Sequence, residues 1–208
     1  PSEYDHGAGT PLVINFHGTS GTAGGQAGFS RYDVIADRRT VLVAYPEGLP
    51  LDGTNVFDAG LRDFTNEPRD DVDFTRAIID SVAERACLNR RRVYATGMSN
   101  GGRMSYRLAC DAADVIAAIA PVAGSLSMET ERCSPSRPIS NIHFHGTADE
   151  VAPYGEAAGL SLRPVPDMFR LWADFNGCTG EPENVFDIDD VRCEAFTRCE
   201  AGTEVVLC

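Results

Sequence analysis

Six short apolar runs, bounded by polar or turn-forming residues, recur along the chain. Runs of this length are typical of buried β-strands, because helices need longer segments with a period of about 3.6 residues. We predict strands over residues 12–16, 40–45, 92–96, 116–122, 139–144 and 204–207.

Three segments between these runs instead show helical periodicity. Residues 71–86 begin with acidic residues, which suit the positive end of a helix dipole. Residues 100–110 and 167–176 each place apolar residues on one side, and the second has a stripe of Met168, Leu171, Trp172 and Phe175. We interpret this stripe as core packing, with Gly177 ending the helix.

Strands that alternate with helices predict an α/β fold with a mostly parallel central sheet and helices on both faces. The length of 208 residues fits one domain over residues 1–208. Active sites of such sheets lie on loops at the carboxyl ends of the strands. Residues 49–69 read as a long surface loop, and we expect this loop and residues 150–166 to wall a substrate pocket.

Charge and cysteine content restrict the classes of function. The net charge is −13, and all 18 basic residues are Arg, which disfavours binding to nucleic acid or to an anionic membrane surface. The seven Cys do not form paired metal knuckles. Their number favours structural disulfides and an oxidising compartment. We therefore expect no metal site, and the sequence does not indicate an oligomeric state.

The stretch "YATGMSNGG" at residues 94–102 contains the pattern G-x-S-x-G centred on Ser99. It follows a predicted strand and opens a predicted helix, which is the setting of a serine hydrolase nucleophile elbow. Gly97 and Gly101 permit the tight turn. The alternative is a glycine-rich turn with Ser99 as a helix cap, and the strand–turn–helix context favours the nucleophile.

Two further motifs occur in an order that suits this chemistry. "HGTSGT" at residues 17–22 follows the first strand, where hydrolases of this class carry an oxyanion-hole loop. We expect the backbone N–H groups of Thr19 and Asn100 to be the two donors. "HGTAD" at residues 145–149 follows the fifth strand and places Asp149 after Ser99, where the triad acid belongs. A turn-forming Asp is the alternative.

Together, "PLVINFHGTSGTAGGQ", "VYATGMSNGGRMSYRLAC", "IAPVAG" and "HFHGTADEVAPY" resemble the polyhydroxybutyrate-depolymerase-like family, which includes feruloyl and acetyl xylan esterases. The resemblance covers nearly the whole chain. It implies an α/β-hydrolase fold, secretion, no cofactor and ester hydrolysis through an acyl-enzyme. It supports Ser99 as nucleophile, Asp149 as acid, and Thr19 and Asn100 as oxyanion donors. It also implies a disulfide between Cys178 and Cys199.

A second disulfide candidate is Cys110 with Cys133, because both flank the strand at residue 116. The odd number of Cys leaves one without a partner inside this sequence.

This sequence differs from the family pattern in its catalytic histidine. In the family it follows the strand that reads "EVVLC" here, so we expect it just after Cys208, in a chain trimmed at both ends. His17 lies in the oxyanion loop, His6 lies near the terminus, and for His143 and His145 we favour structural hydrogen bonding.

The sequence therefore favours a secreted serine ester hydrolase acting on polyester or hydroxyalkanoate esters. A feruloyl or acetyl xylan esterase is the first alternative. A non-catalytic polymer-binding descendant and an acyltransferase that uses the same triad are the others. We expect small-molecule or polymeric ester substrates as partners.

Overall fold

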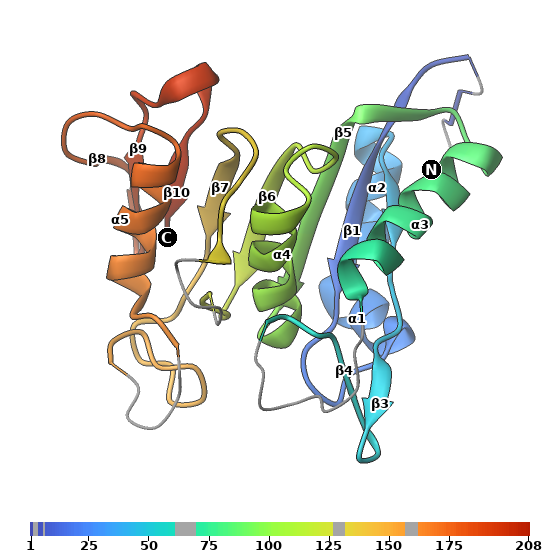
Figure 1. The fold of residues 1–208 in the computed structure, drawn as a ribbon, viewed down its shortest axis with the longest axis horizontal. Helices are drawn as coiled ribbons and strands as arrows, with labels where there is room; N and C mark the ends of the chain where they lie inside the picture. The colour runs from blue at the N-terminus through green and yellow to red at the C-terminus, as the bar shows by residue number, and fades with distance from the viewer. Residues whose placement is uncertain (2–3, 6, 61–69, 127–131, 157–161) are drawn as a thin grey trace.

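The computed structural model describes residues 1, 4–5, 7–60, 70–126, 132–156 and 162–208. Its centre is an eight-stranded sheet in the order β2-β1-β5-β6-β7-β10-β9-β8 (Figure 1). The strands span Thr10–Phe16 (β1), Leu42–Ala44 (β2), Leu88–Met98 (β5), Ala118–Val122 (β6), Ser140–His143 (β7), Glu183–Ile188 (β8), Val191–Phe196 (β9) and Val205–Leu207 (β10). A separate hairpin joins Leu49–Leu51 (β3) to Thr54–Val56 (β4).

The first six strands of this order pair in parallel, and β9 and β8 add an antiparallel edge. The helices are Ala23–Ser30 (α1), Tyr32–Arg39 (α2), Asp71–Arg85 (α3), Asn100–Asp111 (α4) and Val165–Phe175 (α5), with a 3₁₀ turn at Glu200–Gly202. In Figure 1, α3, α4 and α5 lie in front of the sheet, and α1 and α2 lie behind its β1–β2 end. The predicted α/β class is confirmed.

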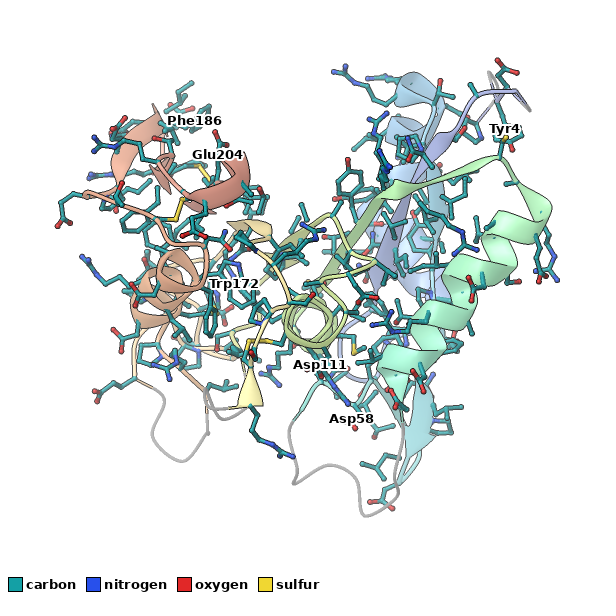
Figure 2. All side chains as sticks on the ribbon, turned by 45° about the horizontal axis from the view of Figure 1, so that its top comes forward. Tyr4, Asp58, Asp111, Trp172, Phe186 and Glu204 are labelled. Atoms are coloured by element: carbon teal, nitrogen blue, oxygen red, sulfur yellow. A yellow bond between two sulfur atoms is a disulfide. The ribbon has the colours of Figure 1, made fainter. Side chains whose placement is uncertain are left out.

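The apolar stripe of the last helix is core packing, as predicted. Met168 and Trp172 are fully buried, and the Trp172 indole N–H donates to the Ile139 carbonyl over 3.2 Å. Asn176, at the end of the helix, accepts from Ile139 N and donates to Ile139 O. Trp172 lies inside the molecule, whereas Phe186 on β8 lies at its outer end (Figure 2).

The structure adds elements that hydrophobic patterning missed. Residues 49–69 are not simply a loop, because β3 and β4 form a hairpin within them; residues 61–69 lie outside the described part. Helix α1 is glycine-rich and is capped by the Thr22 hydroxyl, which accepts from Gly25 N. All six residues of β8 are exposed, so no alternation marked it as a strand.

The carboxyl ends of the parallel strands lie toward the lower edge of Figure 1, where the β3–β4 hairpin also lies. This is the edge on which the fold class predicts an active site. Across the ranges that the structure describes, no helix is long and apolar enough to cross a bilayer.

Candidate functional site

Ser99 lies at the sharp turn between β5 and α4. Its backbone has φ 56° and ψ −114°, a conformation that costs a non-glycine residue of the order of 1–3 kcal/mol and that often marks a functional site. Ser99 N donates to Val122 O at 2.9 Å, which ties the turn to the end of β6. A strained serine at a sharp strand-to-helix turn is the backbone geometry of a nucleophile elbow.

Three glycines around Ser99 allow the backbones to approach closely. A Cβ on Gly97 or Gly101 would lie 2.5 or 2.2 Å from Phe16 O, and a Cβ on Gly124 would lie 2.3 Å from Ser99 O. No side chain fits at such distances. The elbow is therefore pressed against the ends of both β1 and β6.

The loop after β1 lies beside the elbow. A Cβ built on Gly18 would be 3.5 Å from the Ser99 Cβ, and the exposed Thr19 is the next residue of this loop. Asn100 is the first residue of α4, where helix geometry leaves the N–H without an intrahelical acceptor. The structure thus places Ser99 and Asn100 beside the loop that carries Gly18 and Thr19.

The side chain of Asn100 has a second task that sequence reasoning missed. Its Oδ1 accepts from Phe57 N at 2.8 Å, and its Nδ2 donates to Phe57 O at 3.0 Å. Asn100 is buried, and the Phe57 ring lies 5.1 Å from Phe16 and 4.6 Å from His17. The segment after β4 is thereby fixed against the elbow.

Asp149 lies in the loop after β7. Its Oδ1 accepts from Val151 N at 2.9 Å and from Ala152 N at 2.8 Å, whereas its Oδ2 is 3.7 Å from His145 Nε2. The Ala152 amide, followed by the Val151 amide and His145, lowers the pKa of the Asp149 carboxyl. The group is therefore a carboxylate at neutral pH, and one of its two oxygens faces no backbone amide of this loop.

A short ladder links the Ser99 turn to the Asp149 loop. Ser99 N pairs with Val122 O, and the adjacent Ala123 N donates to Phe144 O at 2.9 Å. Only β6 lies between the strands that carry Ser99 and Asp149. The two residues share the carboxyl edge of the sheet, and no hydrogen bond joins them.

The three histidines that the structure describes all have both ring nitrogens engaged. His17 pairs with Gly18 O through Nδ1 and accepts from Gly48 N through Nε2. His143 pairs with Tyr106 and His145, and His145 pairs with His143 and the Ala152 carbonyl. None contacts the Ser99 hydroxyl through a hydrogen bond. His6 lies outside the described residues.

Three disulfides join distant segments. The two pairs singled out in the sequence, Cys110–Cys133 and Cys178–Cys199, are both bonded. A third bond, Cys193–Cys208, ties β9 to the end of β10. Cys87 is the remaining thiol and is exposed.

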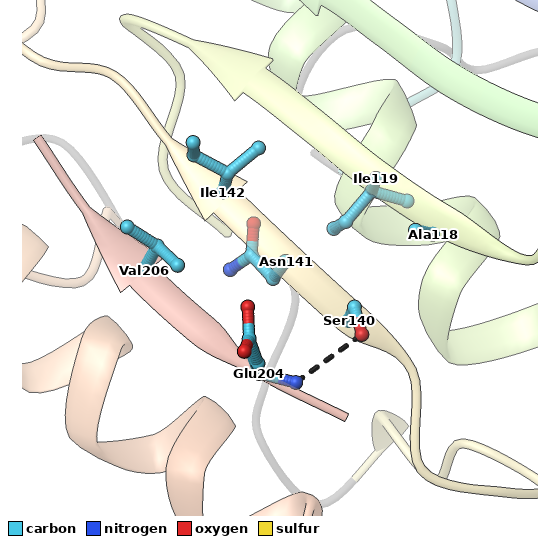
Figure 3. Close-up of a pocket in the computed structure, with 7 residues that line it drawn as sticks. All are labelled: Ala118, Ile119, Ser140, Asn141, Ile142, Glu204 and Val206. Atoms are coloured by element: carbon cyan, nitrogen blue, oxygen red, sulfur yellow. Dashed lines mark hydrogen bonds between the residues drawn. The ribbon is translucent and has the colours of Figure 1, made fainter. Parts of the chain in front are cut away.

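A hollow of about 220 Å³ lies away from this site (Figure 3). Its lining includes Ala118 and Ser140, which begin β6 and β7, and Glu204, which precedes β10. Ser99 follows the opposite, carboxyl end of β5. Within the described ranges, no group of His, Cys, Asp and Glu side chains has the arrangement of a metal site.

Comparison with known proteins reveals relatives among esterases, although no protein-family model matches the chain. Feruloyl esterase B of Piromyces equi is 35% identical over 220 residues, which cover 100% of this chain and 40% of that protein. The putative esterase NocK of Nocardia uniformis subsp. tsuyamanensis is 35% identical over 76% of this chain and 44% of its own length. The chain thus spans less than half the length of these two relatives.

A more distant relative is the bifunctional acetylxylan esterase/xylanase XynS20E of Neocallimastix patriciarum, which is 29% identical over 83% of this chain and 24% of its own length. Among solved structures, an acetyl xylan esterase from Aspergillus awamori superimposes with a TM-score of 0.75 at 14% identity, covering 100% of this chain and 84% of that one. A thermostable esterase gives a TM-score of 0.60 at 18% identity, over 84% and 46% of the two chains. These structural neighbours share the fold.

Proposed function

Because this chain belongs to the feruloyl esterase-like family of α/β-hydrolases, we propose that it hydrolyses carboxylic esters with Ser99 as nucleophile. The observation that carries this proposal is the strained backbone of Ser99 at the amino end of α4, with the Gly18–Thr19 loop beside it. A positively polarised helix end and free amides are suited to a developing oxyanion.

In the proposed reaction, Ser99 Oγ attacks the ester carbonyl carbon while a histidine base takes its proton. The carbonyl oxygen becomes an oxyanion and accepts hydrogen bonds from Thr19 N–H and Asn100 N–H. The alcohol leaves with the proton returned by the histidine, and an acyl group remains on Ser99. The same histidine then deprotonates a water that attacks the acyl carbon; the bond to Ser99 Oγ breaks, the acid leaves, and the histidine returns the proton to Ser99 Oγ. Asp149 orients the imidazole through the carboxylate oxygen that the loop amides do not use.

We propose that the base is a histidine in residues that follow Cys208. The geometry of β10 supports this position, because Cys208 N donates to His143 O at 2.8 Å and His145 N donates to Cys208 O at 2.9 Å. The backbone therefore leaves β10 beside the loop of Asp149. The described histidines are poor candidates, since their nitrogens are already hydrogen-bonded within the fold.

For the substrate class we propose feruloyl or acetyl esters of plant cell-wall xylan. The relatives named as feruloyl and acetylxylan esterases favour this alternative over the polyester reading that the sequence motifs first favoured. The three disulfides also support an extracellular, oxidising location. A panel of methyl ferulate, acetylated xylan and 3-hydroxybutyrate oligomers tests the class. The highest kcat/KM on the oligomers would contradict it.

The catalytic roles are tested in the full-length protein with 4-nitrophenyl acetate. We expect Ser99→Ala to lower kcat by about 10⁴-fold to 10⁶-fold and Asp149→Asn by about 10⁴-fold. Ser140→Ala, at the distant hollow, is the matched control and retains wild-type kcat. Rapid hydrolysis by Ser99→Ala would sink the proposal, and a wild-type protein without hydrolytic activity would favour the polymer-binding alternative.

A further inference from the structure

A chain of buried polar side chains connects α4 to the loop of Asp149. Asn141 Nδ2 donates to the Tyr106 hydroxyl at 3.1 Å, and that hydroxyl is 2.8 Å from His143 Nδ1. His143 Nε2 is 2.9 Å from His145 Nδ1, and His145 Nε2 is 2.6 Å from Ala152 O. The two imidazole rings are stacked, with 10° between their planes. Both histidines and Tyr106 are buried.

The position of each proton in this chain follows from its last member. The Ala152 carbonyl can only accept, so His145 Nε2 carries a hydrogen and the neutral ring offers Nδ1 as an acceptor. His143 Nε2 must then donate to it, which leaves His143 Nδ1 to accept from the Tyr106 hydroxyl. The neutral chain therefore has one consistent direction, from Asn141 to the Asp149 loop.

The same loop is closed by Asp149 itself. Ala152 O accepts from His145, and Ala152 N donates to Asp149 Oδ1. Asp149 Oδ2 lies 3.7 Å from His145 Nε2, beyond a normal hydrogen bond. His145 thus holds Ala152, whose N–H binds Oδ1 of Asp149. The Oδ2 atom of Asp149 has no short hydrogen bond to His145.

Burial disfavours the charged form of His143. It lowers the pKa of His143 to about 3, with a smaller contribution from the neighbouring His145. The groups that face His143 are the Tyr106 hydroxyl from α4 and the His145 ring, and burial raises the pKa of that hydroxyl. The Tyr106 hydroxyl therefore stays protonated at neutral pH and can donate to His143 Nδ1.

We propose that His145 is a positioning residue for the carboxylate of Asp149, and that Tyr106 and His143 fix the tautomer with which it acts. This inference rests on the proposed role of Asp149 as triad acid. His145 anchors residue 152 so that Asp149 Oδ1 stays bound to the loop amides and Oδ2 stays directed to the catalytic imidazole. A displaced acid would misorient that imidazole, and misplacements of about 1 Å can cost about 10²-fold in rate.

The test compares two variants of the full-length protein, with 4-nitrophenyl acetate as substrate. His145→Phe keeps the ring volume and removes both hydrogen bonds. We expect kcat to fall by about 10²-fold with KM changed less than about 2-fold, because binding groups are untouched. His145→Gln restores an amide donor for Ala152 O and an acceptor for His143. We expect kcat of His145→Gln to lie within about 5-fold of wild type, because the amide can replace the hydrogen bonds to Ala152 O and from His143.

A double-mutant cycle separates positioning from general structural damage. If His145 acts through Asp149, His145→Phe lowers kcat no further when Asp149→Ala is already present. An equal loss in both backgrounds would overturn the inference. Tyr106→Phe, which changes the far end of the chain, keeps the test decisive if His145→Phe does not fold. We expect this variant to lose about 2-fold to 10-fold in kcat, because the His145 contact to Ala152 O remains while the tautomer of His143 is no longer fixed. An unchanged kcat would count against the role of Tyr106 and His143.

The two proposals fail in different ways. If Asp149→Ala retains wild-type kcat, Asp149 is not the triad acid and the proposed function is wrong in that respect. If Asp149→Ala abolishes hydrolysis while a folded His145→Phe retains wild-type kcat, only the positioning role is wrong.

Discussion

The turn at Ser99 and the loop at Asp149 are built by different means. At Ser99, backbones meet backbones, and Gly97, Gly101 and Gly124 are required because no Cβ fits between them. At Asp149, side chains hold the backbone, through the carboxylate itself and through His145. The turn at Ser99 requires residues without a Cβ, whereas the loop at Asp149 requires side chains that donate and accept specific hydrogen bonds.

The largest effect is expected at Gly101. In Gly101→Ala, the added Cβ would lie 2.2 Å from Phe16 O, so β1 or α4 must move. We expect the free energy of unfolding to fall by about 3 kcal/mol or more and hydrolysis to be lost. Gly24→Ala is the control, since nothing lies within 4 Å of its Cβ in α1. That change should stabilise by up to about 1 kcal/mol.

Urea denaturation of both glycine variants measures this difference. Equal stabilities for Gly101→Ala and wild type would contradict the close approach of Gly101 to the Phe16 carbonyl.

This contrast also explains which features the sequence revealed. Gly97, Ser99 and Gly101 lie within five residues of one another in a single motif, so a short sequence pattern predicts the turn, whereas Gly124 lies outside that motif. The chain that supports Asp149 joins residues 37 positions apart, Tyr106 and His143, and the Asn100 clamp on Phe57 spans 43 positions. Such contacts exist only once the fold has brought the segments together.

The elements follow the same division. Helix α5 was predicted because its apolar stripe repeats with the helical period and packs into the core. Strand β8 could not be predicted in this way, because none of its side chains is buried. Its backbone pairing with β9 defines it as a strand. Helix α1 depends on its Thr22 cap and on the Gln26 amide, which donates to Asn15 at 2.8 Å, rather than on an apolar face.

An intermediate effect is expected for the side chain of Asn100, which connects the elbow to the segment after β4. Asn100→Ala leaves the buried N–H and C=O of Phe57 without their partners. We expect a loss of about 2–4 kcal/mol in the free energy of unfolding, since each unsatisfied buried group costs about 1–3 kcal/mol. Asn89→Ala, which removes an exposed contact to Arg91 N, should change stability by less than about 0.5 kcal/mol.

Chemical denaturation of the two asparagine variants checks this expectation. If Asn100→Ala lowers the free energy of unfolding no more than Asn89→Ala does, the hydrogen bonds from Asn100 to Phe57 do not stabilise the turn.

The smallest effect is expected in the pH dependence of the free energy of unfolding, through His143 in the hydrogen-bonded chain that supports Asp149. His143 stays neutral in the folded protein down to a pKa of about 3, whereas an unfolded His takes up a proton near pH 6.5. The unfolded state therefore binds more protons between these values. Stability is complete above pH 6.5 and falls on acidification, by about 1.4 kcal/mol per pH unit from this residue.

Unfolding curves at pH 6.5, 5.5 and 4.5 for wild type and His143→Gln isolate this contribution. We expect the slope of stability against pH to be smaller in His143→Gln by about 1.4 kcal/mol per pH unit. Parallel slopes would show that His143 does not remain neutral in the fold.

We propose that the strained Ser99 after β5 forms the acyl-enzyme. The most direct measurement is peptide mass spectrometry of the full-length protein after reaction with a fluorophosphonate, which modifies activated serine nucleophiles. We predict one adduct, on the peptide that carries Ser99, with loss of hydrolysis in proportion to labelling. An adduct on any other serine, or full inhibition with Ser99 unmodified, would contradict it.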